Sequence, residues 1–221
     1  QRQDKMEFIR DFCASTQCPV SVAFRAVDYL DRYSNALYAA ETKTIDWQLA
    51  VLCACTFIAI KMEDFRTTHS CKEVLSLAFA ERVEKRDMLC QESIIIFALH
   101  YELETITAPA FIEFYVHRAK LGGIVLEKAV DLCMKTLGCA SFYQFRPSMI
   151  AMSCIYAANV YLTKSADIPP SFVTELFSRA QGHVQFIDCV TLLGVIQARQ
   201  DTAGLPDEKG IDIKLKTVIS A

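Results

Sequence analysis

The segment Trp47-Gln-Leu-Ala-Val-Leu-Cys-Ala-Cys-Thr-Phe-Ile-Ala-Ile60 contains no charged residue. A helix of this composition is apolar on nearly every side, which is typical of a helix surrounded by other helices. The run is shorter than the roughly 20 residues that span a bilayer. It is followed at once by Lys61-Met-Glu-Asp64, whose charges must reach solvent or a partner. The segment therefore predicts the buried central helix of a bundle.

Helical spacing extends to both sides of this segment, and no stretch alternates convincingly with the period of two that strands show. We expect first-half helices over about 4–14, 19–33 and 45–62, from the capping box Ser70-Cys-Lys-Glu73, and over 83–101. We expect second-half helices from Thr107-Ala-Pro109, over 125–137 and 148–162, from Pro169-Pro170, and over 183–198. The sequence therefore predicts an all-α fold.

The two halves repeat each other at an offset of about 100 residues. Phe8-Ile9 corresponds to Phe111-Ile112, and Val27-Asp28 corresponds to Val130-Asp131. We therefore predict two tandem five-helix bundles, each of ordinary domain size. They cover residues 1–104 and 105–198, and residues 199–221 form an extended tail.

Composition excludes several classes of function. None of the 7 glycines precedes Gly122, so the first half has no glycine-rich phosphate loop. The net charge of -3 gives no basic surface for nucleic acid or for an anionic membrane. The 10 cysteines include no CxxC pair, and the 4 histidines lack metal-ligand spacing. We expect an intracellular protein with reduced thiols, no catalytic residues, no metal and no cofactor.

Three motifs together resemble the cyclin family. They are Ala26-Val-Asp-Tyr-Leu-Asp-Arg-Tyr33, Trp47-Gln-Leu49 and Ala59-Ile-Lys-Met-Glu-Asp64. Arg146-Pro-Ser-Met-Ile-Ala151 and the Trp-Gln-Leu string are similar to plant D-type cyclins. The resemblance implies two cyclin boxes. It also implies a regulatory subunit, not an enzyme, that binds and activates a cyclin-dependent kinase in cell-cycle control. Such a protein acts in the nucleus, the cytoplasm or both.

The resemblance also implies the residues that contact the kinase. Cyclins carry a Lys at the start of helix three and a Glu in helix four; here these positions hold Trp47 and Glu73, with Lys43 one turn earlier as a substitute. Trp47 fits a core anchor or an interface hot spot equally well. Glu73 fits a helix cap, a kinase contact or both. We interpret Lys61 and Glu63 as kinase contacts.

Two further sets of residues have assigned roles. Asp31 and Arg32 are interpreted as mainly structural, with the Arg tying helix ends together, because helix-end carbonyls need partners. Gln1-Arg-Gln-Asp-Lys5 and Phe8 replace the apolar anchors of the groove with which many cyclins bind Arg-x-Leu peptides. We therefore predict weak or absent docking of such peptides.

Two other functions stay open at the level of sequence. A diverged cyclin that acts only as an adaptor is credible because Trp47 replaces the Lys. A general transcription factor of the TFIIB type also has two such boxes, but its DNA binding needs a basic face, which the net charge of -3 disfavours.

Overall fold

The computed structural model describes residues 2–15, 18–39, 49–63, 76, 83–163 and 180–202. Within these residues there is no β-strand, so the all-α prediction is confirmed. The chain divides into two compact units, Gln1–Thr107 and Ala108–Ala221, whereas the sequence predicted a boundary after residue 104. The fourth helix predicted for each bundle, from Ser70 and from Pro169, lies outside the described residues. None of the described helices is both long enough and apolar enough to cross a lipid bilayer.

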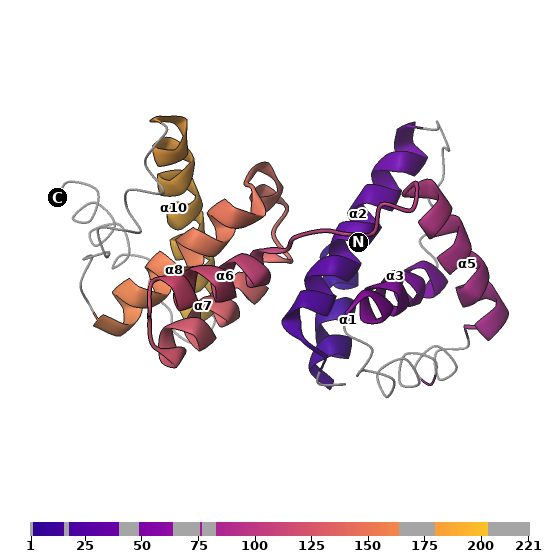
Figure 1. Cartoon of the computed structure of the whole chain (residues 1–221), viewed down its shortest axis with the longest axis horizontal. Coiled ribbons are helices and arrows are strands. Elements are labelled where there is room, and N and C mark those ends of the chain that lie inside the picture. Colours follow the sequence, from indigo (N-terminus) through magenta and orange to yellow (C-terminus); the bar gives the residue numbers. More distant parts are fainter. Residues whose placement is uncertain are drawn as a thin grey trace. The chain divides into compact units, whose positions relative to one another are not determined.

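The first unit is built around one helix. Its described helices are α1 (Arg2–Ser15), α2 (Val20–Ala39), α3 (Leu49–Met62) and α5 (Lys85–Ala98). Helix α3 packs against α1, α2 and α5, which lie around it in Figure 1. Every residue from Ala50 to Ile60 is buried. The prediction of a surrounded central helix is therefore confirmed.

Helix α2 is longer than predicted. The sequence predicted its end at Tyr33, because the following stretch is polar, but the helix continues to Ala39. Ser34 donates its hydroxyl to the carbonyl of Leu30 inside the helix. A serine that bonds back to the preceding turn satisfies its own side chain without ending the helix. The polar residues of this stretch thus lie on a helix and not in a connection.

Helix α5 ends in a turn with an unusual backbone. His100 and Tyr101 both have a positive φ, of 53° and 61°. This left-handed region is sparsely populated by residues other than glycine. The amide of Tyr101 donates to the carbonyl of Ile96 at 3.0 Å, which satisfies one of the orphan carbonyls of the helix end. The turn directs residues 102–105 toward α2.

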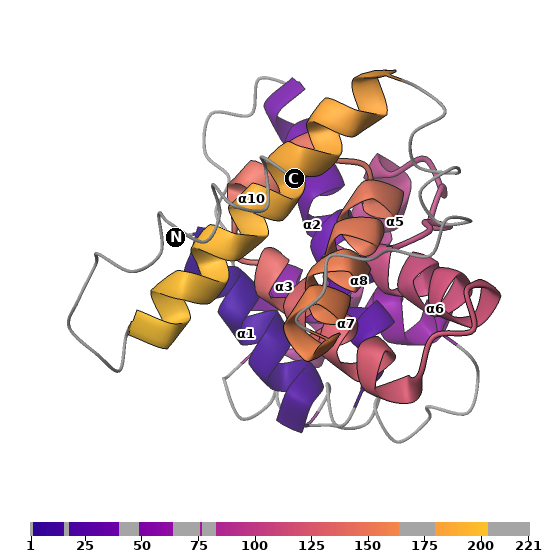
Figure 2. The ribbon, with the colours of Figure 1, turned by 90° about the vertical axis from the view of Figure 1, so that its left-hand side faces the viewer.

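The second unit repeats the plan around α8. Its described elements are α6 (Ala108–Arg118), α7 (Gly123–Thr136), the 3-10 helix η2 (Ala140–Gln144), α8 (Pro147–Thr163) and α10 (Ala180–Thr202). Helix α8 packs against α6, α7 and α10; Figure 2 turns this unit toward the viewer. Helix α10 continues to Thr202, past residue 199, where the sequence predicted the start of a tail; residues 203–221 lie outside the described residues.

Candidate functional site

Lys61 closes helix α3 and points to helix α5. Its ammonium lies 2.6 Å from Oε1 of Glu92 and 4.1 Å from the centroid of the Phe57 ring. A lysine in the last turn is also favoured by the helix dipole. Lys61 is exposed, whereas Glu92 is half-buried. The pair therefore fixes one positive and one negative charge at the edge between α3 and α5.

Glu63 lies two residues further on but points to a different helix. Its Oε1 accepts a hydrogen bond of 2.7 Å from the hydroxyl of Ser21 in α2. Its Oε2 lies 3.4 Å from Nε of Arg25 and forms an ion pair with it. Both atoms are buried, and the geometry between them is not that of a hydrogen bond. Arg25 also donates to the carbonyl of Met62 at 3.3 Å. Glu63 thus belongs to a cluster that fastens the end of α3 to the start of α2.

The structure separates the two charges that the sequence grouped together. Lys61 faces α5 and Glu63 faces α2, although both were interpreted as kinase contacts. The other three residues of that prediction, Lys43, Trp47 and Glu73, lie outside the described residues. Their role as kinase contacts stays a prediction.

Arg32 ties α2 to the segment that follows α5. It donates to the carbonyl of Glu102 at 2.7 Å and forms an ion pair with the carboxylate of Asp28 at 3.4 Å. One turn earlier, the hydroxyl of Tyr29 donates to the carbonyl of Leu103 at 2.6 Å. Both carbonyls belong to backbone without helical partners, which needs such donors when it is buried. Arg32 therefore anchors a backbone segment, as does Tyr29, which the sequence reading did not single out for this role.

The carboxylates near Arg32 have different surroundings. Burial raises the pKa of Asp28, against the opposing effects of Arg32 and of a hydrogen bond from Thr105. Asp31 lies close enough to Cys55 for its negative charge to contribute, after burial, to raising the pKa of that thiol. Asp31 and Arg32 are therefore adjacent in the sequence but contact different parts of the first unit.

The outer side of α5 carries a feature that the sequence reading missed. We define the α5 outer face as Leu89, Cys90, Ile94 and Phe97. All four are exposed; Phe97 exposes 71 % of its surface and Ile94 exposes 43 %. A helix at the surface of a stable monomer normally places polar residues on this side. Among the residues that the structure describes, nothing covers the α5 outer face, which is therefore an exposed apolar surface.

The signal for this surface was present in the sequence. Met88, Ile95 and Leu99 recur at helical spacing and are buried, so they define the inner side of α5. In the run Ile94-Ile-Ile-Phe97, burying Ile95 forces its neighbour Ile94 toward solvent. An apolar residue on both sides of one helix predicts a second packing surface.

The described residues hold no group of three or more His, Cys, Asp or Glu side chains able to bind a metal ion. The thiols are mainly core residues. Burial raises the pKa of Cys189 to about 12, and burial together with Cys133 raises the pKa of Cys154. A buried thiol with a raised pKa is a poor nucleophile, since the thiolate is the reactive form. The described residues therefore provide neither a metal site nor a reactive buried thiol. What the first unit offers is the apolar α5 outer face, with the Lys61–Glu92 pair beside it.

Comparison with known proteins identifies the first unit. Residues 1–104 match the sequence family described as "Cyclin, N-terminal domain". The first unit is therefore similar to the N-terminal domain of cyclins. The resemblance inferred from the motifs is thereby confirmed.

Two plant proteins are similar in sequence. The chain is 30 % identical to Cyclin-D3-1 of Oryza sativa subsp. japonica over 141 residues, which are 62 % of this chain. It is 23 % identical to Cyclin-D1-1 of Arabidopsis thaliana over 210 residues, which are 93 % of this chain. The aligned residues span 40 % and 61 % of the lengths of these two relatives.

One solved structure shares the fold across both units. The X-ray structure of a viral cyclin from Herpesvirus saimiri aligns with a TM-score of 0.66 and 19 % identity. The alignment covers 87 % of this chain and 85 % of that one. The cyclin fold therefore extends over most of the chain, including the second unit, which the N-terminal domain family does not reach.

Proposed function

We propose that this chain is a regulatory subunit that binds and activates a cyclin-dependent protein kinase, through the α5 outer face and the charged edge beside it. The match of residues 1–104 to the cyclin N-terminal domain supports the type of partner. The observation that carries the site is the exposure of Ile94 and Phe97 opposite the buried Met88 and Ile95. Exposed apolar surface of this kind marks interaction sites.

The chemistry of the surface suits a docked helix. The apolar side chains supply the buried centre of an interface, and the Lys61–Glu92 pair supplies a polar rim that sets register. An exposed ion pair contributes little stability by itself, so its value lies in orientation. The sequence resemblance assigns Trp47, Glu73 and Lys43 to the kinase interface as well, and this assignment stays a prediction.

The mechanism is a shift of the kinase between two states. A kinase is active when the Lys–Glu ion pair that orients ATP has formed, and this depends on the position of its regulatory helix. A cyclin that binds the active state of the kinase more tightly than the inactive state raises the population of the active state. The size of the shift is set by the ratio of the two affinities. The chain contributes binding energy and no catalytic group. We propose that it acts in the nucleus, the cytoplasm or both.

Co-expression with a panel of cyclin-dependent kinases tests this function. We expect one or more of them to form a stable complex with the chain and to gain activity on a protein substrate. Phe97→Glu should abolish the complex because it places a charge in the centre of the interface. Ile124→Glu is the matched control, since Ile124 is an equally exposed apolar residue (69 %) on α7. If both variants lose the complex, or if both keep it, the α5 outer face is not the kinase-binding surface.

One alternative has an observation in its favour. The resemblance implies that Trp47 replaces a Lys of the family, which suits a diverged cyclin that binds a kinase without activating it. The same panel separates the two functions, because an adaptor forms the complex but leaves kinase activity unchanged.

A further inference from the structure

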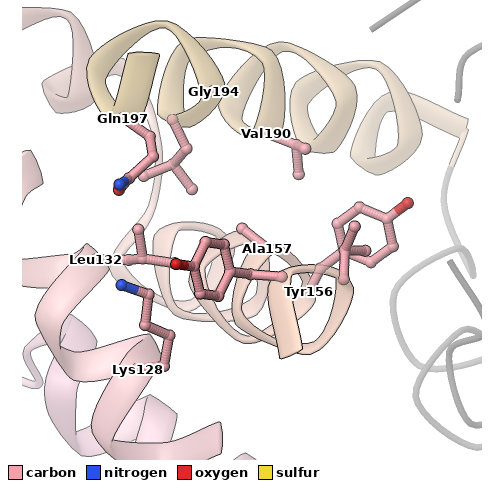
Figure 3. A pocket seen from close by; sticks show the side chains of 10 residues that line it. Lys128, Leu132, Tyr156, Ala157, Val190, Gly194 and Gln197 are labelled. Carbon is pink, nitrogen blue, oxygen red and sulfur yellow. The ribbon is translucent and has the colours of Figure 1, made fainter. Parts of the chain in front are cut away.

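The second unit contains a pocket that the kinase-binding surface does not use. It has a volume of about 280 Å³ and lies between α8 and α10, with α7 at one side (Figure 3). This is close to the lower end of the ~300–1,000 Å³ typical of pockets for small organic molecules. The pocket is lined by Lys128, Leu132, Tyr156, Ala157, Val160, Tyr161, Val190, Leu193, Gly194 and Gln197.

The pocket is apolar along its length and polar at one end. Figure 3 shows Lys128 of α7 and Gln197 of α10 at the same end of the pocket, with Tyr156 and Val190 toward the other. The ammonium of Lys128 lies 4.7 Å from the centroid of the Tyr161 ring, which holds it at the rim. A ligand that fills this space needs an apolar body and one polar group.

The charges at that end favour an anion. Lys128 and Lys135 both pair with one carboxylate, that of Asp131, at 3.3 Å and 3.4 Å. Lys135 also donates to Oε1 of Gln197 at 3.1 Å. Two ammonium groups sharing one carboxylate leave one positive charge in excess among these three side chains. An incoming carboxylate would compensate this charge through charge-assisted hydrogen bonds, which are stronger than neutral ones.

Gly194 is a second sign that this space is functional. It lies in the interior of α10, where glycine costs about 1 kcal/mol of helix stability relative to alanine. Because Gly194 lines the pocket, a side chain at this position would occupy part of the space. The helix thus contains an unfavourable residue at the point where it borders the pocket.

We propose that the second unit binds a small organic carboxylate with an unbranched apolar chain, of the medium-chain fatty acid type. The chain lies between α8 and α10, and the carboxylate pairs with Lys128. The site is independent of the α5 outer face, which belongs to the first unit.

Methyl NMR of the full chain with octanoate tests the site. We expect the methyl signals of Leu132, Val160, Val190 and Leu193 to shift with saturation, while those of Leu30 and Val51 in the first unit do not. Octanol should bind about fivefold or more weakly, since it lacks the charge-assisted contact. Octylammonium should not bind, because its charge repels Lys128.

Two variants identify the residues responsible. Gly194→Leu should abolish octanoate binding by filling the pocket, and Ala157→Leu does the same from α8 if the first variant unfolds. Lys128→Met should weaken octanoate about fivefold or more and leave octanol unchanged, while the control Lys120→Met changes neither. The proposal is overturned if octanol or octylammonium binds as tightly as octanoate, if the pocket methyls do not respond, or if binding survives in folded Gly194→Leu or Ala157→Leu protein.

Discussion

Helices α3 and α5 of the first unit are both rich in apolar residues, but the chain buries them to different extents. Helix α3 is buried from Ala50 to Ile60, through contacts with α1, α2 and α5. Helix α5 buries Met88 and Ile95 on its inner side and exposes Ile94 and Phe97 on the other. Within the described residues, α3 is therefore buried on all sides, whereas α5 is buried on its inner side only.

This difference separates stability from recognition. Side chains of α3 and of the inner side of α5 hold the unit together, because their burial is achieved on folding. Side chains of the α5 outer face bury less of their surface on folding and keep apolar area available for a partner. Residues of the same type on the same helix should therefore respond differently to the same substitution.

Alanine substitution at two adjacent isoleucines is the sharpest test of this separation. Ile95 exposes 0 % of its surface, so Ile95→Ala should lower the free energy of unfolding by about 2–5 kcal/mol through lost burial and a cavity. Ile58→Ala in α3 should cost a similar amount. Ile94→Ala should cost less than about 1 kcal/mol. Urea unfolding followed by circular dichroism measures all three, and equal losses at positions 94 and 95 would break the comparison.

Kinase affinity should depend on the exposed residues of α5 more than on the buried ones, which is the reverse of the order for stability. Phe97→Ala should weaken the kinase complex by about tenfold or more, as truncation of a central aromatic residue does in many interfaces. The free energy of unfolding should stay within about 0.5 kcal/mol of the wild-type value. Titration calorimetry with the partner found in the panel measures the affinity, with Ile124→Ala as the control. An unchanged dissociation constant would place the interface elsewhere.

The two charged residues at the end of α3 should also differ, with Glu63 contributing to stability and Lys61 to kinase binding. Glu63→Ala should lower the free energy of unfolding by about 1–2 kcal/mol, because it leaves Ser21 and Arg25 without their partner, and should leave kinase affinity unchanged. Lys61→Met should weaken kinase binding and cost less than about 1 kcal/mol of stability, since the ammonium end of the Lys61–Glu92 pair is exposed. Weaker kinase binding by Glu63→Ala at unchanged stability would restore Glu63 to the interface.

The smallest expected effect concerns Asp28, which helps to hold the segment after α5. Burial raises the pKa of Asp28 above its ordinary value of 3.8, so the folded state binds this proton more tightly than the unfolded state. The contribution of Asp28 to stability therefore falls as pH rises from about 3.8 through the raised pKa.

Asp28→Asn should remove this pH dependence, with a difference below about 1 kcal/mol because the group is partly exposed. Unfolding of both proteins at several values between pH 4 and pH 7 measures it. If the stability advantage of the wild type over the variant grew with pH, the direction assigned to Asp28 would be wrong.

The sequence predicted the arrangement of helices better than the roles of their charged ends. The uncharged run from Trp47 predicted the buried centre of the first unit, because an apolar helix has few other stable places. The directions of Lys61 and Glu63 depend on partners in α5 and α2, distant in sequence, which no local pattern specifies. The α5 outer face was predictable from the spacing of Met88 and Ile95. A helix that buries these two residues cannot also bury Ile94 and Phe97, which lie on its other side.

Protection of Cys90 from alkylation tests the central claim most directly. Cys90 belongs to the α5 outer face and is exposed, whereas Cys139 in the second unit is half-buried and outside this surface. We expect the bound kinase to slow modification of Cys90 by iodoacetamide about tenfold or more and to leave Cys139 unchanged, as measured by peptide mass spectrometry. Equal rates for Cys90 in the free chain and in the kinase complex would contradict the assignment of the α5 outer face to kinase binding.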